Sequence, residues 1–118
     1  MSRECEFHHR IQSDMKSLPE DPEIEDAFGD LFEQVVLMPQ DGPAGTTVVC
    51  QKPVPDGIYL VLKLGMALAC IARRDDARTV LLHLAVANSK RTSEDAIREG
   101  YSRYMGYTWP EKGTSYAT

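Results

Sequence analysis

Alternation of polar and apolar residues at the start of the chain changes to a helical period within the first ten residues. The segment 3–7 alternates, which predicts a short strand with Cys5 and Phe7 facing inward. Pro19 ends the helical pattern that follows. The apolar positions of this first helix, spaced as on one helical face, are Ile11, Met15 and Leu18.

The clearest helical period of the chain covers residues 24–36. Asp21 is the expected N-cap, with Pro22 in the first turn of the helix. Its apolar stripe consists of Ile24, Ala27, Phe28, Leu31, Phe32, Val35 and Val36. Acidic residues lie away from that stripe, so we interpret the helix as core-packing, with an acidic outer face, rather than as one wall of a binding groove.

Frequent proline and glycine residues mark the segment from Pro39 to Asp56. This composition predicts a long loop, with one strand-like triplet at Val48–Cys50 that could form a short edge strand. The segment contains no nucleotide-binding glycine spacing, so the sequence gives no support for a phosphate-binding loop.

Three apolar runs with strand character follow, at Ile58–Leu64, Ala67–Ile71 and Val80–Val86, and Gly65 marks the first turn between them. All three runs are apolar on both faces, unlike a sheet with one solvated face. The two helices can cover one face. The other face needs the last helix, a second copy of the chain or a partner protein.

Thr92 is the expected N-cap of the last helix, and Gly106 is expected to end it. We therefore expect one α+β domain over residues 1–107, with a twisted, mainly antiparallel sheet and a polar tail at 108–118. The expected core includes Phe7, Ile11, Phe28, Leu31, Phe32, Leu62, Ile71, Leu82 and Leu84.

Composition bounds the class of protein. With 118 residues, of which 42% are hydrophobic, the chain fits one domain with one modest core. No apolar run approaches the roughly 18 residues that cross a bilayer, and the acidic N-terminal sequence is unlike a signal peptide. The three cysteines, Cys5, Cys50 and Cys70, lack metal-ligand spacing. They indicate reduced thiols in the cytoplasm, with a disulfide between two of them as the alternative.

Charge is unevenly distributed along the chain, whose net charge is −5. Residues 1–56 carry four basic against twelve acidic side chains, a balance of −8. Residues 57–118 carry nine against six, a balance of +3. This asymmetry permits a local basic patch for nucleic acid on an acidic protein, although two solvated surfaces of different sign explain it equally well.

Short segments in a fixed order are similar to motifs of one toxin family. They are Glu4–His8 with the helix that ends at Leu18-Pro19, then Asp56–Tyr59, Val80–His83 and Lys90–Ser93. Through these segments and the expected order β-α-α-β-β-β-α, the chain resembles the RelE/HigB/ParE superfamily of toxins from type II toxin–antitoxin pairs. The resemblance covers most of residues 3–105 and implies a RelE-like single-domain fold.

The resemblance to HigB proteins implies a toxin that cleaves mRNA on the ribosome and so inhibits translation. Its implied partners are an antitoxin protein, the ribosome and mRNA, with no cofactor and no membrane. The alternative is a non-catalytic inhibitor or interaction module, for example a ParE-like binder of DNA gyrase. Leu62 and Leu64 favour that alternative, because the corresponding positions are often basic in HigB proteins. We also expect a partner polypeptide, or a homodimer, on the sheet face that the first two helices leave uncovered.

RNA cleavage by a ribose 2′-hydroxyl needs cations around the phosphate and a proton donor or acceptor. By the resemblance, the catalytic candidates are Lys63, Arg91 and Tyr101. The RNA-binding candidates are Arg73, Arg74, Arg78, Lys90 and Arg91. Each has a plainer interpretation: the basic residues can be solvated strand and hairpin charges, and Tyr101 can pack the last helix onto the sheet.

The basic and histidine side chains differ in how well they suit a functional role. Lys90 and Arg91 are the stronger phosphate candidates, because they precede an expected helix N-terminus, where backbone N–H groups converge. His83 lies among leucines in a central strand, which indicates a hydrogen-bonded core histidine rather than a general base. His8 and His9 have no further ligands near them in sequence, so we expect no metal site.

Overall fold

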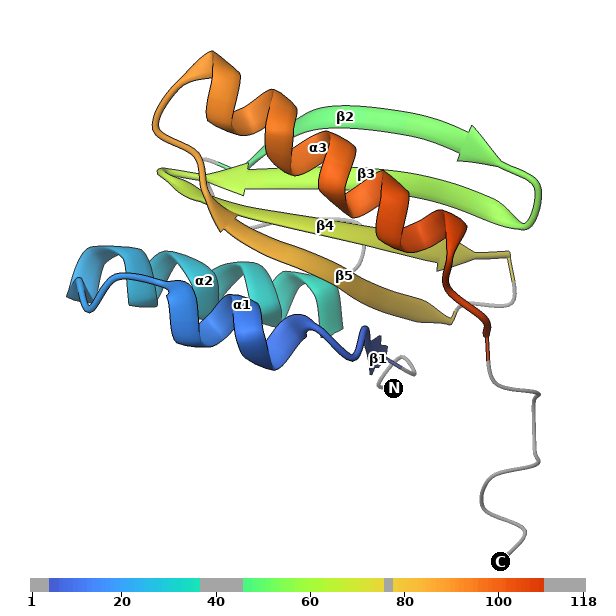
Figure 1. The fold of residues 1–118 in the computed structure, drawn as a ribbon, viewed down its shortest axis with the longest axis horizontal. Helices are drawn as coiled ribbons and strands as arrows, with labels where there is room; N and C mark the ends of the chain where they lie inside the picture. The colour runs from blue at the N-terminus through green and yellow to red at the C-terminus, as the bar shows by residue number, and fades with distance from the viewer. Residues whose placement is uncertain (1–4, 37–45, 76–77, 110–118) are drawn as a thin grey trace, which may run out of the picture.

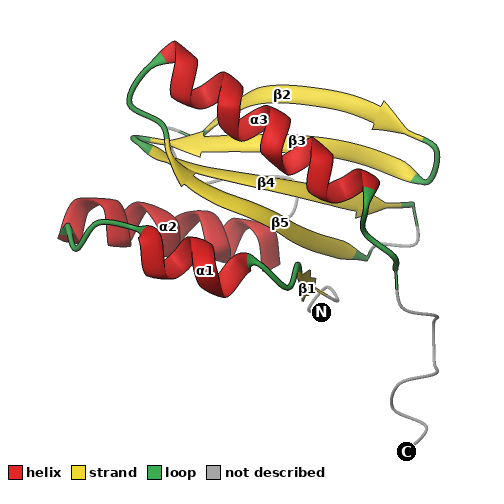
Figure 2. Cartoon of the chain, viewed as in Figure 1, coloured by secondary structure: helices red, strands yellow, loops and turns green. Residues whose placement is uncertain are grey.

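A five-stranded sheet in the order β1-β5-β4-β3-β2 forms the centre of the molecule (Figures 1 and 2). The computed structural model describes residues 5–36, 46–75 and 78–109, leaving out the side chains of 34–36. The strands are β1 (Cys5–Phe7), β2 (Thr47–Val54), β3 (Gly57–Leu64), β4 (Ala67–Arg74) and β5 (Thr79–Val86). The helices are α1 (Ile11–Ser17), α2 (Pro22–Val36) and α3 (Lys90–Met105).

The sheet is mixed. The pairs β2–β3, β3–β4 and β4–β5 are antiparallel, and β3, β4 and β5 form the meander predicted from the three apolar runs. Gly65 makes the β3–β4 turn with a φ of +60°, a conformation that favours glycine. β1 returns to the far edge and pairs parallel with β5, with Cys5 opposite Thr79 and Phe7 opposite Leu81. The described chain is thus one α+β domain of three helices and five strands.

Helices cover both faces of the sheet (Figure 1). α1 and α2 pack on one face over a cluster that includes Ile11, Leu31, Leu60, Leu62 and Ile71. α3 packs on the other face over a second cluster that includes Tyr59, Val61, Leu68, Cys70, Leu82 and Ala96. Alternate residues of β3 therefore serve different cores, which explains why that strand is apolar at nearly every position. The sequence left three possibilities for covering the second face, and the last helix is the one that covers it.

The contact between α3 and the sheet is close, and a glycine makes it possible. A Cβ atom added to Gly100 would lie 2.4 Å from the Tyr59 hydroxyl oxygen and 2.5 Å from the Cys70 Cβ. Hydrogen bonds fix the same contact, since the Tyr59 hydroxyl donates to the carbonyl of Ile97 at 2.7 Å. The Cys70 Sγ lies 3.4 Å from the carbonyl oxygen of Ala96. The helix is therefore held at a fixed depth on this face.

The region predicted as a long loop contains a complete strand. β2 pairs with β3 from Thr47 to Val54, with a register shift between Val48 and Cys50. Residues 39–45 of that prediction lie outside the described part of the chain. Pro53 misled the interpretation, because proline is excluded from central strands but tolerated at a sheet edge, where β2 lies. The expected element order therefore lacked one strand.

Three further expectations need correction. Phe7 and Phe32 are not core residues but remain 51% and 44% exposed, while Phe28 and Leu84 are only partly buried. The N-cap of α3 is Ser89 rather than Thr92. Thr92 is the third residue of the helix and forms a capping box with Ser89. Trp109 was expected in a polar tail, but it packs against the α3-side cluster.

The length and hydropathy of the helices bear on whether one of them could cross a bilayer. Among the described residues, none of the helices is long and apolar enough to span a membrane.

Candidate nucleic-acid interface

Three of the predicted RNA-binding arginines gather at one end of the sheet. Arg73 and Arg74 are the last residues of β4, and Arg78 directly precedes β5. Backbone pairing holds them together, because the Arg74 N–H donates to the carbonyl of Arg78 at 2.8 Å. Arg78 is buried, whereas Arg73 and Arg74 are partly exposed.

The same end of the molecule receives the chain as it leaves α3. The guanidinium carbons of Arg74 and Arg78 lie 5.4 and 5.5 Å from the centre of the Trp109 ring, within cation–π range. The Tyr107 ring meets Trp109 edge-on at 5.3 Å. We call Arg74, Arg78, Tyr104, Tyr107 and Trp109 the basic-aromatic end. Arg73 shares the opposite sheet face with Ile71 and acts electrostatically on Cys5 there.

Tyrosines of the basic-aromatic end hold their protons. Burial, followed by the hydrogen bond to the carboxylate of Glu6, raises the pKa of Tyr107. Burial, followed by the nearby charge of Asp56, raises the pKa of Tyr104, while Arg74 opposes that rise. Both phenols are therefore neutral at pH 7. Because the Tyr107 hydroxyl already donates to Glu6, Tyr104 is the phenol that could donate a hydrogen bond to a bound anion.

Lys90 and Arg91 lie at the N-terminal end of α3, whereas the basic-aromatic end lies at its C-terminal end. They are the first two residues of α3, and both side chains are exposed. A helix of α3's sixteen residues is about 24 Å long, so this pair is separated from the basic-aromatic end by most of the molecule. The capping box takes up the N–H of Thr92 at 3.1 Å. The predicted RNA-binding residues thus form two groups rather than one.

The three predicted catalytic residues are likewise not brought together. Lys63 is partly buried near the end of β3, opposite Leu68, and shares the sheet face of Tyr59 and Val61. Tyr101 follows Arg91 by ten residues in α3, which corresponds to about 15 Å along the axis. Arg91 and Tyr101 therefore cannot both contact one phosphate.

Tyr101 packs α3 onto the sheet, as its plainer interpretation proposed. Its ring meets Tyr59 edge-on at 5.3 Å and lies 6.1 Å from Tyr104. The ammonium of Lys52, on β2, lies 4.1 Å from the centre of the Tyr101 ring. Sequence reasoning missed Lys52, because the segment around it was interpreted as a loop.

A buried polar network links α1, β5 and α3. The Asp14 carboxylate accepts two hydrogen bonds from the Arg103 guanidinium, at 2.7 and 3.0 Å. The Nδ1 atom of His83 lies 3.0 Å from the same carboxylate. His83 is thus the hydrogen-bonded histidine that its leucine neighbours indicated. Arg103 also donates to Glu99 at 2.9 Å.

The network supplies hydrogen-bond partners for backbone groups of β5 that lie beyond its pairing with the short strand β1. The Leu84 N–H donates to Asp14 at 3.1 Å, and Arg103 donates to the Leu82 carbonyl at 2.9 Å. Burial alone would raise the pKa of Asp14, but hydrogen bonds from Arg103, Leu84 and His83 together lower it. Asp14 is therefore ionised at neutral pH and serves the architecture of the sheet edge. Its catalytic use as a histidine partner has no support here, since most of its hydrogen bonds go elsewhere.

Metal and thiol chemistry have little basis in the described residues. Within 5–36, 46–75 and 78–109, no group of three or more His, Cys, Asp and Glu side chains is arranged to hold a metal ion. Cys5, Cys50 and Cys70 are free thiols. Burial raises the pKa of Cys70 to about 12, so its thiol stays protonated and unreactive.

No model of a known protein family, no curated protein and no solved structure matches this chain.

Proposed function

We propose that this chain is a toxin of a type II toxin–antitoxin pair, similar to RelE and HigB proteins, that acts on mRNA at the ribosome. The observation that carries the proposal is the arrangement of elements together with the basic-aromatic end. A strand, two helices on one face, an antiparallel meander and a last helix follow in the order that the resemblance implies. The additional strand β2 precedes the meander, so the observed order is β-α-α-β-β-β-β-α, one strand more than the resemblance implies.

RNA contact at the basic-aromatic end has a physical basis. Single-stranded RNA is bound by proteins through cations along its backbone and aromatic rings on which bases stack. The partly exposed Arg74 supplies a cation, the buried Arg78 adds its charge without contacting the RNA, and the partly exposed Trp109 supplies the largest ring. The neutral phenol of Tyr104 adds a hydrogen-bond donor for a phosphate oxygen, whereas the Tyr107 hydroxyl already donates to Glu6.

Lys90 and Arg91 form a second contact in this proposal. They lie about 24 Å away along α3, a separation that suits a nucleic acid extending along the helix rather than one phosphate. Partners of the proposed toxin are mRNA, the ribosome and an antitoxin protein.

Cleavage of the RNA is the second part of the proposal and would use Tyr101 as proton donor. The cation beside Tyr101 is Lys52 rather than Arg91, since Lys52 lies 4.1 Å from its ring centre. A phosphate at Tyr101 would therefore be stabilised by Lys52. Lys63, on the same sheet face, is the remaining cationic candidate.

Expression of the intact chain in bacteria tests the proposal. We expect growth arrest with transcripts cleaved in their coding regions. Trp109→Leu, which keeps an apolar side chain but removes the stacking ring, should relieve the arrest. The matched control is Arg98→Gln, which removes an exposed charge of α3 that pairs with Asp95. Normal growth and intact transcripts with the unaltered chain would refute the proposal.

A non-catalytic interaction module is the second candidate, and one observation favours it. The residues predicted for catalysis are dispersed over the molecule, with Arg91 at the start of α3 and Tyr101 about 15 Å away. Growth arrest with DNA damage signalling and intact transcripts would select this candidate, with DNA gyrase as the target.

A further inference from the structure

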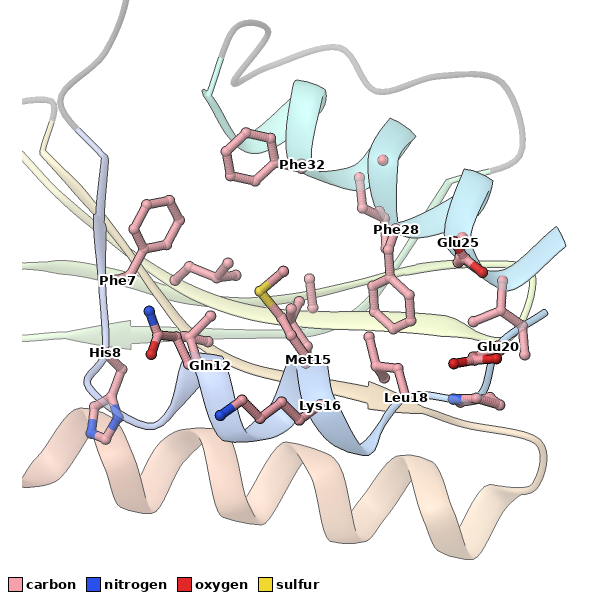
Figure 3. A pocket seen from close by; sticks show the side chains of 18 of the residues that line it. Phe7, His8, Gln12, Met15, Lys16, Leu18, Glu20, Glu25, Phe28 and Phe32 are labelled. Carbon is pink, nitrogen blue, oxygen red and sulfur yellow. The ribbon is translucent and has the colours of Figure 1, made fainter. Parts of the chain in front are cut away.

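An apolar groove lies between α1 and α2, on the side of the sheet opposite α3 (Figure 3). Its floor is formed by the sheet residues Ala69, Leu81 and Leu84. The two helices form its walls, and the volume between them is about 1150 Å³. Ala69 and Leu81 remain buried at 1% and 3% exposed, so the groove is open at its walls rather than down to the sheet.

Large apolar side chains line this groove and remain exposed to solvent. Met15 on α1 is 58% exposed, Phe32 on α2 is 44% exposed and Phe7 on β1 is 51% exposed. The Phe7 and Phe32 rings stack with their centres 5.9 Å apart, which joins β1 to α2 at one end of the groove. A contiguous apolar surface of this kind marks an interaction site more often than an ordinary surface.

The charge around the groove is one-sided. All charged residues of α2 are acidic and exposed: Glu23, Glu25, Asp26, Asp30 and Glu33. Glu20 adds a further carboxylate where the chain enters α2, and it lines the groove together with Glu25 (Figure 3). On the facing wall, the exposed Lys16 is the cation that lines the groove. Glu20 and Glu25 line the groove, while the remaining carboxylates lie on the outer face of α2, and together they favour a basic partner beside α2.

We propose that this groove binds an amphipathic helix of a partner protein, with its apolar stripe in the groove and lysine or arginine residues facing α2. The volume exceeds the roughly 300–1000 Å³ of small-molecule pockets, and the groove is open along the helices. A helix laid in a groove contributes apolar residues at helical spacing, which matches a site walled by two helices. α2 has fifteen residues and is about 22 Å long, enough to accompany four turns of a partner helix.

A second copy of the chain fits this groove less well. A symmetric dimer would bring two α2 helices close together, and each carries five acidic residues and no basic residue. Like charges at such a contact oppose association. The acidic wall therefore favours a different polypeptide as the occupant. This inference rests on the groove alone and is independent of RNA binding.

A selection experiment tests both the shape and the charge of the proposed partner. The probe is a displayed library of eighteen-residue helical peptides, with leucines fixed on one face and lysine, glutamate, glutamine or serine varied beside them. Selection on the intact chain should enrich lysine over glutamate on one flank of the leucine stripe. Enriched peptides should bind the double variant Met15→Ser/Phe32→Ser at least about tenfold more weakly.

Two further variants provide controls. Met66→Ser/Met105→Ser removes two equally exposed apolar residues away from the groove, and binding should be unchanged. Glu20→Lys/Glu25→Lys leaves the apolar lining intact and should weaken the lysine-rich peptides about tenfold. Circular dichroism melts would establish that every variant folds.

Three results would overturn the inference. The first is a selection that yields no peptide whose binding depends on Met15 and Phe32. The second is enrichment of glutamate instead of lysine. The third is a dimer of the unaltered chain in light scattering that Met15→Ser/Phe32→Ser dissociates, because the occupant would then be a second copy.

Discussion

The two faces of the sheet are equally apolar in sequence but are covered in different ways. On the α3 face, Gly100 lets the helix contact Tyr59 and Cys70 directly, and the core beneath it is closed. On the other face, α1 and α2 bury sheet residues such as Leu81 but leave an apolar groove with exposed side chains such as Met15 and Phe32. Apolar periodicity therefore predicts burial correctly only where a neighbouring element covers the apolar side chain.

The charges of the two faces differ as well. The α3 side carries the two basic groups, at Lys90-Arg91 and at the basic-aromatic end, whereas the α2 wall of the groove is acidic. Under the two proposals, nucleic acid would bind the α3 side and a protein partner the groove. The two surfaces can be altered separately, which makes the comparison testable.

Breaking the network that joins the two faces should have the largest effect. Asp14→Asn leaves the Arg103 guanidinium with a weakened partner at a site where both side chains are 9% exposed. We expect a loss of roughly 3–5 kcal/mol in the free energy of unfolding, as for other broken buried ion pairs. Urea unfolding measures it, with Asp30→Asn on the exposed face of α2 as the matched control. A loss equal to that of the control would show that the network does not join the two layers.

The same network sets the response to acid. Because the folded-state pKa of Asp14 is lowered, its ionised form stabilises the protein above the ordinary aspartate pKa of 3.8. That contribution should be lost as the pH falls through the lowered folded-state value. Urea unfolding between pH 6 and pH 3 should therefore show a steeper loss for the unaltered chain than for Asp14→Asn. Parallel curves for the two proteins would contradict this assignment.

Two helical glycines compare the faces directly. Gly100→Ala places a methyl group against Tyr59 and Cys70 and should cost about 1–3 kcal/mol of stability. Gly29→Ala, on the groove wall, meets nothing within 4 Å and should stabilise by about 0.4–1 kcal/mol. Thermal unfolding of both variants gives the two signs. Equal effects would mean that α2 and α3 are packed alike.

Removing one hydrogen bond beneath α3 should have a moderate effect. Tyr59→Phe deletes the hydroxyl that donates to the Ile97 carbonyl and should cost about 1 kcal/mol. The equilibrium unfolding midpoint measures this loss. A variant as stable as the unaltered chain would mean that shape alone, and not this bond, holds the helix in place.

Truncation within the groove should have the smallest effect. Met15→Ser and Phe32→Ser alter side chains that are already exposed to water, so each should change stability by no more than about 0.5 kcal/mol. A larger loss in thermal unfolding would show that these residues belong to a closed core, as Phe32 was first interpreted from its helical stripe.

Sequence patterns predicted the helices and the central meander, because each has a long apolar period that local residues determine. They failed where the outcome depends on distant parts of the chain. Phe32 has the spacing of a core residue, but its side chain remains 44% exposed. Pro53 suggests a loop until its edge position in the sheet is known.

The candidate sites show the same limit. Arg74 and Arg78 could be selected from sequence as basic residues near a hairpin, but their pairing with Trp109 spans more than thirty positions. No local sequence pattern marks Asp14 or Arg103, because their role depends on the ion pair that they form across the fold. The signal available for Trp109 was that it is the single tryptophan of the chain, in a mostly polar segment.

Crosslinking of RNA to the protein tests the central claim most directly. Ribosomes programmed with an mRNA containing 4-thiouridine would be mixed with the intact chain, irradiated, and the crosslinked residues identified by mass spectrometry. We expect crosslinks at Trp109 and Tyr104, with a second group near Lys90 and Arg91, and few in α2. Crosslinks confined to the groove between α1 and α2, or their complete absence, would contradict the assignment of the α3 side to nucleic acid.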